Sequence, residues 1–357
     1  MGVYNINGDN IETTGNNSAS IVAYGDISTA SGFKNAFDAA MADNSISVLN
    51  IPFGTYSVSS ALRVRGNVEI NGNGSRLNVN AEANIFVFKD VSNCYVHDFV
   101  IDMNQTKDTQ TGTALYILDA SKITMRNIQI LNIGLRACLA YTTDTTENGH
   151  NDYLLWDNVS MHGIGEVNTN FWEWPCGIIA VNCRYSHMRN CVVTGMSRFT
   201  LEFKNHCYYC TMIGNSIVGG REGLCFGGDR PDDVTVLGEN ISASDNHVVG
   251  CEYPIHVNRE KDILFSNNIF DGDCIFVQDS KNIVIDGNII RTGGGDAMSA
   301  IKVFAGDTLM FTNNVYEKKD SSKPLYRYLY GEPTNILLSG FHKGHYINIE
   351  SPEDGMD

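Results

Sequence analysis

The sequence predicts an all-β protein, a single-stranded right-handed parallel β-helix of about ten coils with an N-terminal capping helix. Three observations predict this fold. The 357 residues include 34 glycines but only 7 prolines, and charged residues make up 18% of the chain. This composition suits many short strands joined by tight turns. A short apolar phrase recurs along the chain, and an alternating run precedes most of its copies.

The N-terminal region predicts the entry to the solenoid. Residues 1–30 are expected to form a lead segment. Residues 31–43 carry Phe33, Phe37 and Met41 at helical spacing and predict a short amphipathic helix. Because a solenoid exposes the end of its core, this helix is expected to cap the first coil.

The recurring phrase defines the coils. Three successive copies read "DILFSNNIF", "KNIVIDGNII" and "TLMFTNNVY". Its sixth slot is filled, at spacings of 20 to 32 residues, by Phe99, Ile128, Val159, Cys191, Asn215, Asn246, Asn268, Asn288, Asn314 and Phe341. No short strand can bury its apolar face alone, so successive units are expected to stack in parallel about 4.8 Å apart.

Five successive units carry asparagine at the sixth slot. Stacking would place these amides one above another, so each could donate to the next and satisfy turn backbone. Asparagine also tolerates the left-handed conformation that a sharp corner requires. We therefore expect an amide column at a corner of the β-helix. The β-helix is expected to form one domain, residues 31–320, and a C-terminal segment, residues 321–357, is expected to close it.

Bulk properties exclude several classes of protein. The net charge of −16 argues against a nucleic-acid partner, which needs a surplus of Lys and Arg. No stretch approaches the roughly 20 apolar residues of a membrane span, and the start lacks a signal region, so synthesis in the cytoplasm is expected. Several of the ten cysteines, such as Cys94 and Cys191, fall at apolar slots, which predicts buried thiols rather than disulfides.

Residues 51–75, "IPFGTYSVSSALRVRGNVEINGNGS", resemble the start of the pectate-lyase-like β-helix superfamily. The resemblance implies carbohydrate-active function, because the superfamily includes polysaccharide lyases, glycoside hydrolases, epimerases and bacteriophage tailspikes. The usual "GDG-x-x-D-D" is reduced to "YGDIST", and neither the polygalacturonase-like set of "N-T-D", "D-D" and "R-I-K" nor the pectate-lyase-like "R-x-P-x-x-R" is present. The chain also resembles the tailspike group of this superfamily, and this resemblance implies a homotrimer and a virion-associated or extracellular location.

One candidate sugar site is the insertion at residues 162–176, which holds His162, Glu166, Trp172 and Trp174. Flat aromatic rings beside carboxylates suit a pyranose platform. The alternative is that these rings only seal the loop onto the coils.

A second candidate site lies where turns and strands of successive coils stack. Strand alternation places Glu202, Lys204 and His256 outward. The turns ahead of these strands contribute Arg198, Arg221, Glu222, Glu252 and Asp273. The alternative is a charge ladder on a solvated turn.

Two mechanisms stay open at this second site. Hydrolysis with Glu202 and Glu222 as the carboxylate pair is favoured over β-elimination with Arg221 or His256 as base. The expected partner is a polysaccharide, and no metal or cofactor is predicted. The rival function is that of a non-catalytic glycan-binding adhesin or virion structural protein.

Overall fold

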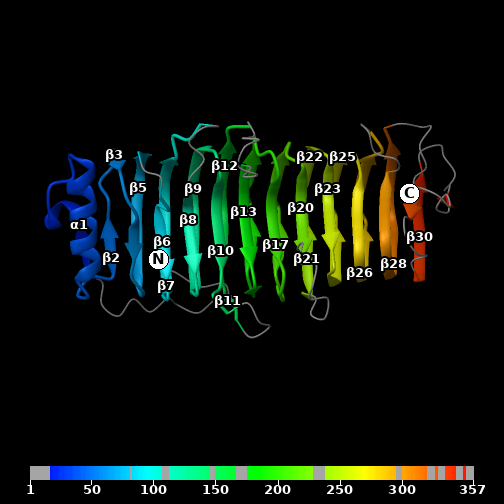
Figure 1. Ribbon diagram of the computed structural model, residues 1–357, viewed down its shortest axis with the longest axis horizontal. Coiled ribbons are helices and arrows are strands. Elements are labelled where there is room, and N and C mark those ends of the chain that lie inside the picture. The colour runs from blue at the N-terminus through cyan, green and yellow to red at the C-terminus, as the bar shows by residue number, and fades with distance from the viewer. Residues whose placement is uncertain are drawn as a thin grey trace. The chain divides into compact units, whose positions relative to one another are not determined.

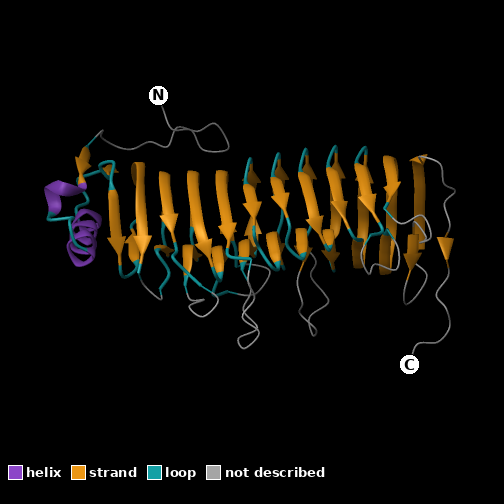
Figure 2. Ribbon diagram, turned by 90° about the horizontal axis from the view of Figure 1, so that it is seen from above, coloured by secondary structure: helices purple, strands orange, loops and turns teal. Residues whose placement is uncertain are grey.

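The computed structural model describes residues 17–80, 83–106, 112–144, 149–165, 175–227, 238–294, 300–319, 326–328, 334–342 and 349–350. The chain divides into two compact units, Met1–Ser197 and Arg198–Asp357. Each unit is described by itself. In both, short strands lie side by side in parallel (Figure 1), and a view from above shows the strands in more than one layer, joined by loops (Figure 2).

Unit 1 begins with the predicted cap. After the strand β1 (Ser18–Ser20) and the 3-10 helix η1 (Ile21–Tyr24), the helix α1 spans Ala30–Ala42. Thr29 caps its N-terminus, because the Thr29 side chain accepts a hydrogen bond from the backbone N–H of Gly32. The buried face packs onto the first coils, because Phe33 stacks on Tyr56 at 5.1 Å and Phe37 meets Phe86 edge-on at 6.3 Å.

The remaining strands of unit 1 stack coil on coil. Phe99, Ile128 and Val159 occupy paired positions in three successive coils and are at most 2% exposed, so the predicted slot forms a core column. The strands are β2 (Val48–Asn50), β3 (Thr55–Val58), β4 (Leu62–Val64), β5 (Val68–Val79), β6 (Phe86–Lys89), β7 (Ser92–Asp102), β8 (Thr113–Leu118), β9 (Ser121–Ile133), β10 (Arg136–Tyr141), β11 (Asn151–Asp152), β12 (Leu155–Gly163), β13 (Cys176–Val181), β14 (Cys183–Arg184), β15 (His187–Arg189) and β16 (Val192–Thr194).

Unit 2 repeats this organisation. Its strands are β17 (Phe199–Lys204), β18 (Thr211–Ile213), β19 (Ser216–Val218), β20 (Glu222–Gly227), β21 (Ile241–Ser244), β22 (His247–Cys251), β23 (Tyr253–Asn258), β24 (Lys261–Ser266), β25 (Ile269–Gly272), β26 (Ile275–Asp286), β27 (Ile289–Thr292), β28 (Ile301–Lys318), β29 (Tyr326–Tyr328), β30 (Thr334–His342) and β31 (Ile349–Glu350). Strands β17, β20, β23 and β26 pair in parallel, each with the next. The predicted fold class, a parallel β-helix with an N-terminal capping helix, is confirmed.

The predicted amide column is present in unit 2. In each of the first four members, Nδ2 donates to Oδ1 of the next asparagine at 2.8 to 3.0 Å, and the backbone N–H donates to the same oxygen at 2.8 to 3.0 Å. The members, each at most 1% exposed, are Asn215, Asn246, Asn268, Asn288 and Asn314. The column is thus a continuous, buried hydrogen-bond network.

The expectation that these asparagines themselves adopt the left-handed conformation is wrong. The positive φ angles fall one residue earlier in every coil, at Gly214, Asp245, Asn267, Gly287 and Asn313. The preceding residue makes the corner, and the column asparagine follows it with its side chain turned inward. The sequence assigned both the backbone turn and the side-chain stacking to the asparagine. In the structure, two neighbouring residues share these roles.

The cysteines agree with the sequence. All ten cysteines lie within the described ranges, where each is buried and none forms a disulfide. Among the described residues, no helix combines the length and apolar character needed to cross a membrane. The boundaries expected at residues 30 and 320 stay predictions.

Candidate active site

Three paired strands of unit 2 place one outward side chain each in a single column. Strand β17 aligns Glu202 with Cys225 of β20, and β20 aligns Cys225 with His256 of β23. The flanking residues Leu201, Phe203, Leu224, Phe226, Ile255 and Val257 are fully buried in the core. Strand alternation therefore directs the three column residues away from the hydrophobic core.

These side chains contribute to a pocket of about 150 Å³. Six residues that the sequence singled out line it: Arg198, Glu202, Lys204, Arg221, Glu222 and His256. Phe199, Cys225, Gly227 and Asn258 complete the lining. The strands and the turns ahead of them thus bring most of the predicted cluster to one place.

Glu202 and Glu222 are buried in this pocket, with 1% and 4% of each residue exposed. Long side chains gather nearby: the Arg198 guanidinium lies 4.4 Å from the centre of the Phe199 ring, and Lys204 Nζ lies 5.7 Å from it. Glu222 is the first residue of β20 rather than part of the turn that precedes the strand. An outward position on this face therefore leads into a pocket and not to open solvent.

A thiol lies between the two carboxyl groups. Cys225 Sγ is 3.8 Å from Oε1 of Glu202 and 3.6 Å from Oε2 of Glu222, at distances where the S–H can donate to either oxygen. Burial raises the pKa of the Cys225 thiol well above its usual value, and the two neighbouring carboxylates raise it further. The thiol is therefore protonated near neutral pH and acts as a hydrogen-bond donor.

A side chain with a basic nitrogen lies beside each acid. Lys204 Nζ lies 3.8 Å from Oε1 of Glu202, and His256 Nδ1 lies 3.1 Å from Oε2 of Glu222. The second pair is at ion-pair distance but lacks the geometry of a hydrogen bond. At the rim, Arg221 Nε is 3.3 Å from Oε2 of Glu252, and both of these side chains are more than 40% exposed.

The turns ahead of the strands stack through their backbones. Glu222 N–H donates to the Arg198 carbonyl at 3.1 Å, and Tyr253 N–H donates to the Arg221 carbonyl at 2.8 Å. One coil further, Cys274 N–H donates to the Glu252 carbonyl at 2.9 Å. Glu252 and the next turn residue, Asp273, do not line the pocket.

Of the predicted sugar platform, the structure describes only His162, which does not line this pocket. His162 belongs to unit 1, at the end of β12, where its Nδ1 is 2.7 Å from Oγ1 of Thr194. Glu166, Trp172 and Trp174 lie outside the described residues. The platform therefore stays a prediction.

Cys225 and Phe199 are pocket residues that sequence reasoning missed. The signal for Cys225 is present in three short runs, "LEF", "LCF" and "IHV", in which one residue stands between two inward apolar positions. Aligning these runs places Cys225 between Glu202 and His256. No comparable pattern marks Phe199, whose ring reaches the pocket from the start of β17.

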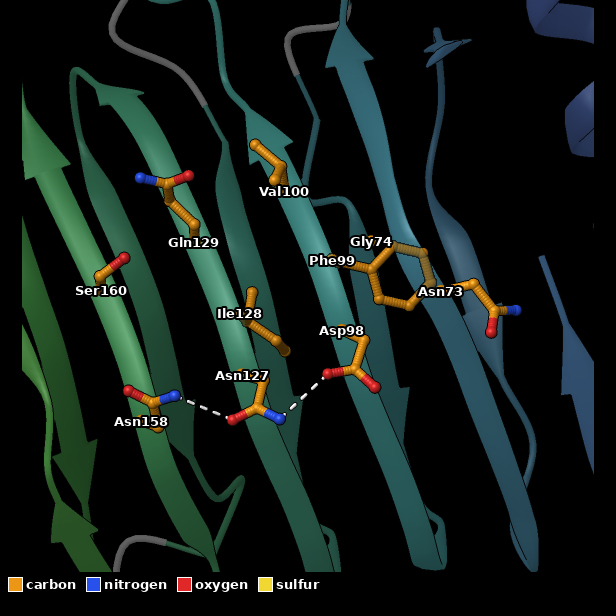
Figure 3. Close-up of a pocket in the computed structure, with 10 residues that line it drawn as sticks. All are labelled: Asn73, Gly74, Asp98, Phe99, Val100, Asn127, Ile128, Gln129, Asn158 and Ser160. Carbon is orange, nitrogen blue, oxygen red and sulfur yellow. Dashed lines mark hydrogen bonds between the residues drawn. The ribbon is translucent and has the colours of Figure 1, made fainter. Parts of the chain in front are cut away.

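A larger, more open groove of about 440 Å³ lies on unit 1 (Figure 3). It follows a corner of three successive coils, where Asn158 Nδ2 donates to Asn127 Oδ1 at 2.9 Å and Asn127 Nδ2 donates to Asp98 Oδ1 at 3.0 Å. Gln129 and Ser160 stand beside this ladder. Apart from the Asp98 carboxylate, the polar side chains of the groove are amides and a hydroxyl, whereas those of the unit 2 pocket are mostly ionisable.

Comparison with known proteins agrees with the fold. The family described as "Right handed beta helix region" matches residues 158–323. No curated protein matches the chain by sequence. These residues and the parallel coils place the chain in the class of right-handed parallel β-helix proteins.

Three solved structures resemble the chain at the level of fold. A variant of the tailspike protein of E. coli bacteriophage HK620, in complex with hexasaccharide, has a TM-score of 0.65 and 15% identity, over 93% of this chain and 66% of that chain. Endo-xylogalacturonan hydrolase from Aspergillus tubingensis has a TM-score of 0.61 and 15% identity, over 94% and 93%. PfbA, a surface adhesin of Streptococcus pneumoniae, has a TM-score of 0.58 and 12% identity, over 93% of each chain. These likenesses show the fold alone, and all three agree with a right-handed parallel β-helix.

Proposed function

We propose that the pocket of unit 2 binds a polysaccharide and cleaves it by glycoside hydrolysis. One observation carries the proposal: two buried carboxyl groups, on Glu202 and Glu222, each lie within hydrogen-bonding distance of the same Cys225 thiol. Burying two acids together is costly, and such arrangements concentrate at functional sites.

The pair matches the chemistry that glycoside cleavage needs. One carboxyl group must protonate the leaving oxygen, and a second must act as base or nucleophile on the sugar. Glu222, whose Oε2 lies 3.1 Å from Nδ1 of His256, is the candidate base or nucleophile. Glu202, the more deeply buried of the two, is the candidate acid.

The cations of the pocket favour an acidic sugar. Arg198, Lys204 and Arg221 all line it, and a guanidinium can hold a carboxylate through two parallel hydrogen bonds. The volume is below the roughly 300 Å³ at which drug-sized sites begin. We therefore expect the pocket to take a single sugar unit of a longer chain, such as a uronate or sialate residue.

β-Elimination is the less favoured reaction at the same pocket. It would need His256 or Arg221 to remove a proton from the sugar ring. His256 instead lies against Glu222, and Arg221 is engaged with Glu252. Both candidate bases are thus oriented towards carboxylates of the protein.

The test is incubation with a panel of acidic and neutral glycans, with two products followed in parallel. Hydrolysis releases reducing ends without the ultraviolet absorbance of an unsaturated uronate, whereas elimination produces both. We expect reducing ends alone, from an acidic glycan. Absence of both products across the panel would contradict cleavage.

Non-catalytic glycan binding is the second candidate function, and the groove of unit 1 favours it. Its amide ladder and the neighbouring Gln129 and Ser160 can exchange hydrogen bonds with sugar hydroxyls without any reaction. Among the fold relatives, PfbA is a surface adhesin. Asn158→Ala, Gln129→Ala or both should weaken glycan binding if the groove is used, while leaving reducing-end release at the other pocket unchanged. This second candidate function includes a role in a virion as a homotrimer. Sedimentation equilibrium measures the oligomeric state directly.

A further inference from the structure

We propose that Glu222, Cys225 and His256 form a binding site for a thiophilic divalent metal ion, of the kind represented by Zn²⁺. Each of the three residues offers one ligand atom, and these atoms all lie within 4.8 Å of one another. This inference concerns a binding activity and does not depend on glycan cleavage.

The spacing of the three atoms fits a tetrahedral ion. With Zn–S near 2.3 Å and Zn–O or Zn–N near 2.0–2.1 Å, tetrahedral angles separate S from O by about 3.5 Å and N from O by about 3.4 Å. Cys225 Sγ and Glu222 Oε2 are 3.6 Å apart, and His256 Nδ1 and Glu222 Oε2 are 3.1 Å apart. Small side-chain movements would bring all three onto one ion.

His256 Nδ1 supports this assignment independently. The atom is buried and makes no hydrogen bond within the described part of the chain, although the Glu222 oxygen lies 3.1 Å away. A ring nitrogen and a carboxylate oxygen that face the same space without a hydrogen bond between them suit a shared cation. Coordination would satisfy both atoms.

The fold holds the donors rigidly. Glu222 and Cys225 belong to β20, and His256 lies on the adjacent strand β23, in register with Cys225. Glu202 Oε1, 3.8 Å from the sulfur, is placed to supply a fourth ligand. Sites built on strands hold their geometry better than sites built on loops.

The donor types select the metal. A thiolate, an imidazole and a carboxylate suit Zn²⁺ and its neighbours in the transition series, whereas Ca²⁺ and Mg²⁺ prefer oxygen ligands alone. Lys204, 3.8 Å from Glu202, and the guanidinium of Arg221 oppose a cation, while two carboxylates and a thiolate attract it. Binding would form a metal–sulfur bond and release the thiol proton to solvent.

The experiment titrates the metal-free full chain with Co²⁺ and Zn²⁺, with no glycan present. We expect one Co²⁺ per chain with a thiolate-to-cobalt charge-transfer band, displaced by Zn²⁺. Cys225→Ser should abolish the band and weaken Zn²⁺ binding by more than the roughly 10–100-fold that loss of a supporting residue costs. His256→Gln should weaken Zn²⁺ binding similarly. Because His256 is only half-buried, this variant provides a second test if Cys225→Ser fails to fold.

Cys251→Ser is the matched control. Cys251 is also buried, but its thiol donates to the Gly219 carbonyl at 3.2 Å. This variant should bind like the wild type. Equal Zn²⁺ affinity in the wild type and in both site variants would overturn the proposal, as would a wild type that binds no stoichiometric metal. Metal binding without glycan cleavage would support this inference and contradict only the proposed function. If cleavage does occur, Zn²⁺ should inhibit it, because the bound ion occupies the Glu222 carboxylate.

Discussion

The side-chain amide of Asn288 donates a hydrogen bond of 3.0 Å to Oδ1 of Asn314, and the backbone N–H of Asn288 donates a second one of 2.9 Å to the same oxygen. In the coil before, Asn268 makes the same two bonds to Asn288, at 2.9 and 2.8 Å. One buried oxygen therefore satisfies two donors of its neighbour. The column stabilises unit 2 by pairing polar groups that the core would otherwise leave without partners.

Asn288→Ala should destabilise the protein. It leaves the backbone N–H and Nδ2 of Asn268 without their acceptor in a site that is 1% exposed. An unsatisfied buried polar group costs about 1–3 kcal/mol, so we expect a loss of about 2–4 kcal/mol in the free energy of unfolding. Urea unfolding followed by circular dichroism measures the loss.

Asn267→Gly is the matched control for this variant. Asn267 is exposed and has a φ of 57°, a conformation that glycine adopts without strain. It should unfold at nearly the urea concentration of the wild type. If the two variants are equally stable, the buried column does not hold the coils together.

Much of the fold could be predicted from the sequence because a solenoid repeats the same local pattern in every coil. The five asparagines indicate their column through their spacing alone. The corner conformation was assigned one residue too late, since side-chain stacking and backbone turning need not fall on the same residue. Spacing reports which residues stack, whereas φ depends on the turn itself.

The sequence predicts most of the residues that line the candidate site, but it does not predict how deeply they are buried. Strand alternation identifies Glu202 as outward. Its exposure, however, depends on the positions of the long side chains around it, such as those of Arg198 and Lys204. Those arrangements arise from residues on other strands and turns. Cys225 was overlooked because a lone cysteine carries no signal until its coil is aligned with the coils of Glu202 and His256.

Stability should fall at alkaline pH through His97 of unit 1. Burial alone would lower the pKa of His97, but hydrogen bonds to Glu69 at 3.1 Å and Asp98 at 2.7 Å, with the attraction of both carboxylates, raise it above the usual 6.5. A raised folded-state pKa means that the stabilisation is complete below about pH 6.5 and is lost as the pH rises through the folded value.

Comparison of the wild type with His97→Gln measures this effect. The variant should be less stable by about 1–2 kcal/mol near pH 6, and the difference should shrink by about pH 9. NMR titration of the imidazole should give a pKa above 6.5. A stability difference that grows with pH would refute the assignment.

Arg221→Gln should weaken binding of an acidic glycan. The guanidinium lines the pocket and is the candidate partner of the sugar carboxylate. We expect KM to rise about tenfold while kcat changes less, which is the signature of lost ground-state binding. If kcat instead fell by two or more orders of magnitude, the result would support Arg221 as the base of an elimination.

Arg291→Gln controls for the loss of an exposed arginine. Its Nε lies 3.2 Å from Glu317, with side-chain exposures of 43% and 51%, close to the 3.3 Å, 43% and 47% of the pair between Arg221 and Glu252. This variant should retain the wild-type KM. Equal effects of the two substitutions would remove Arg221 from the binding site.

The most direct test of hydrolysis at this pocket is the rate of reducing-end release by Glu202→Gln and Glu222→Gln, with Glu252→Gln as the exposed control. Each pocket variant should turn over at least about 100-fold more slowly, the contribution expected of an acid or base, while still binding the glycan. Glu252→Gln should stay within a few-fold of the wild type, because Glu252 does not line the pocket. Undiminished release by both pocket variants would contradict the assignment of this pocket as the site of cleavage.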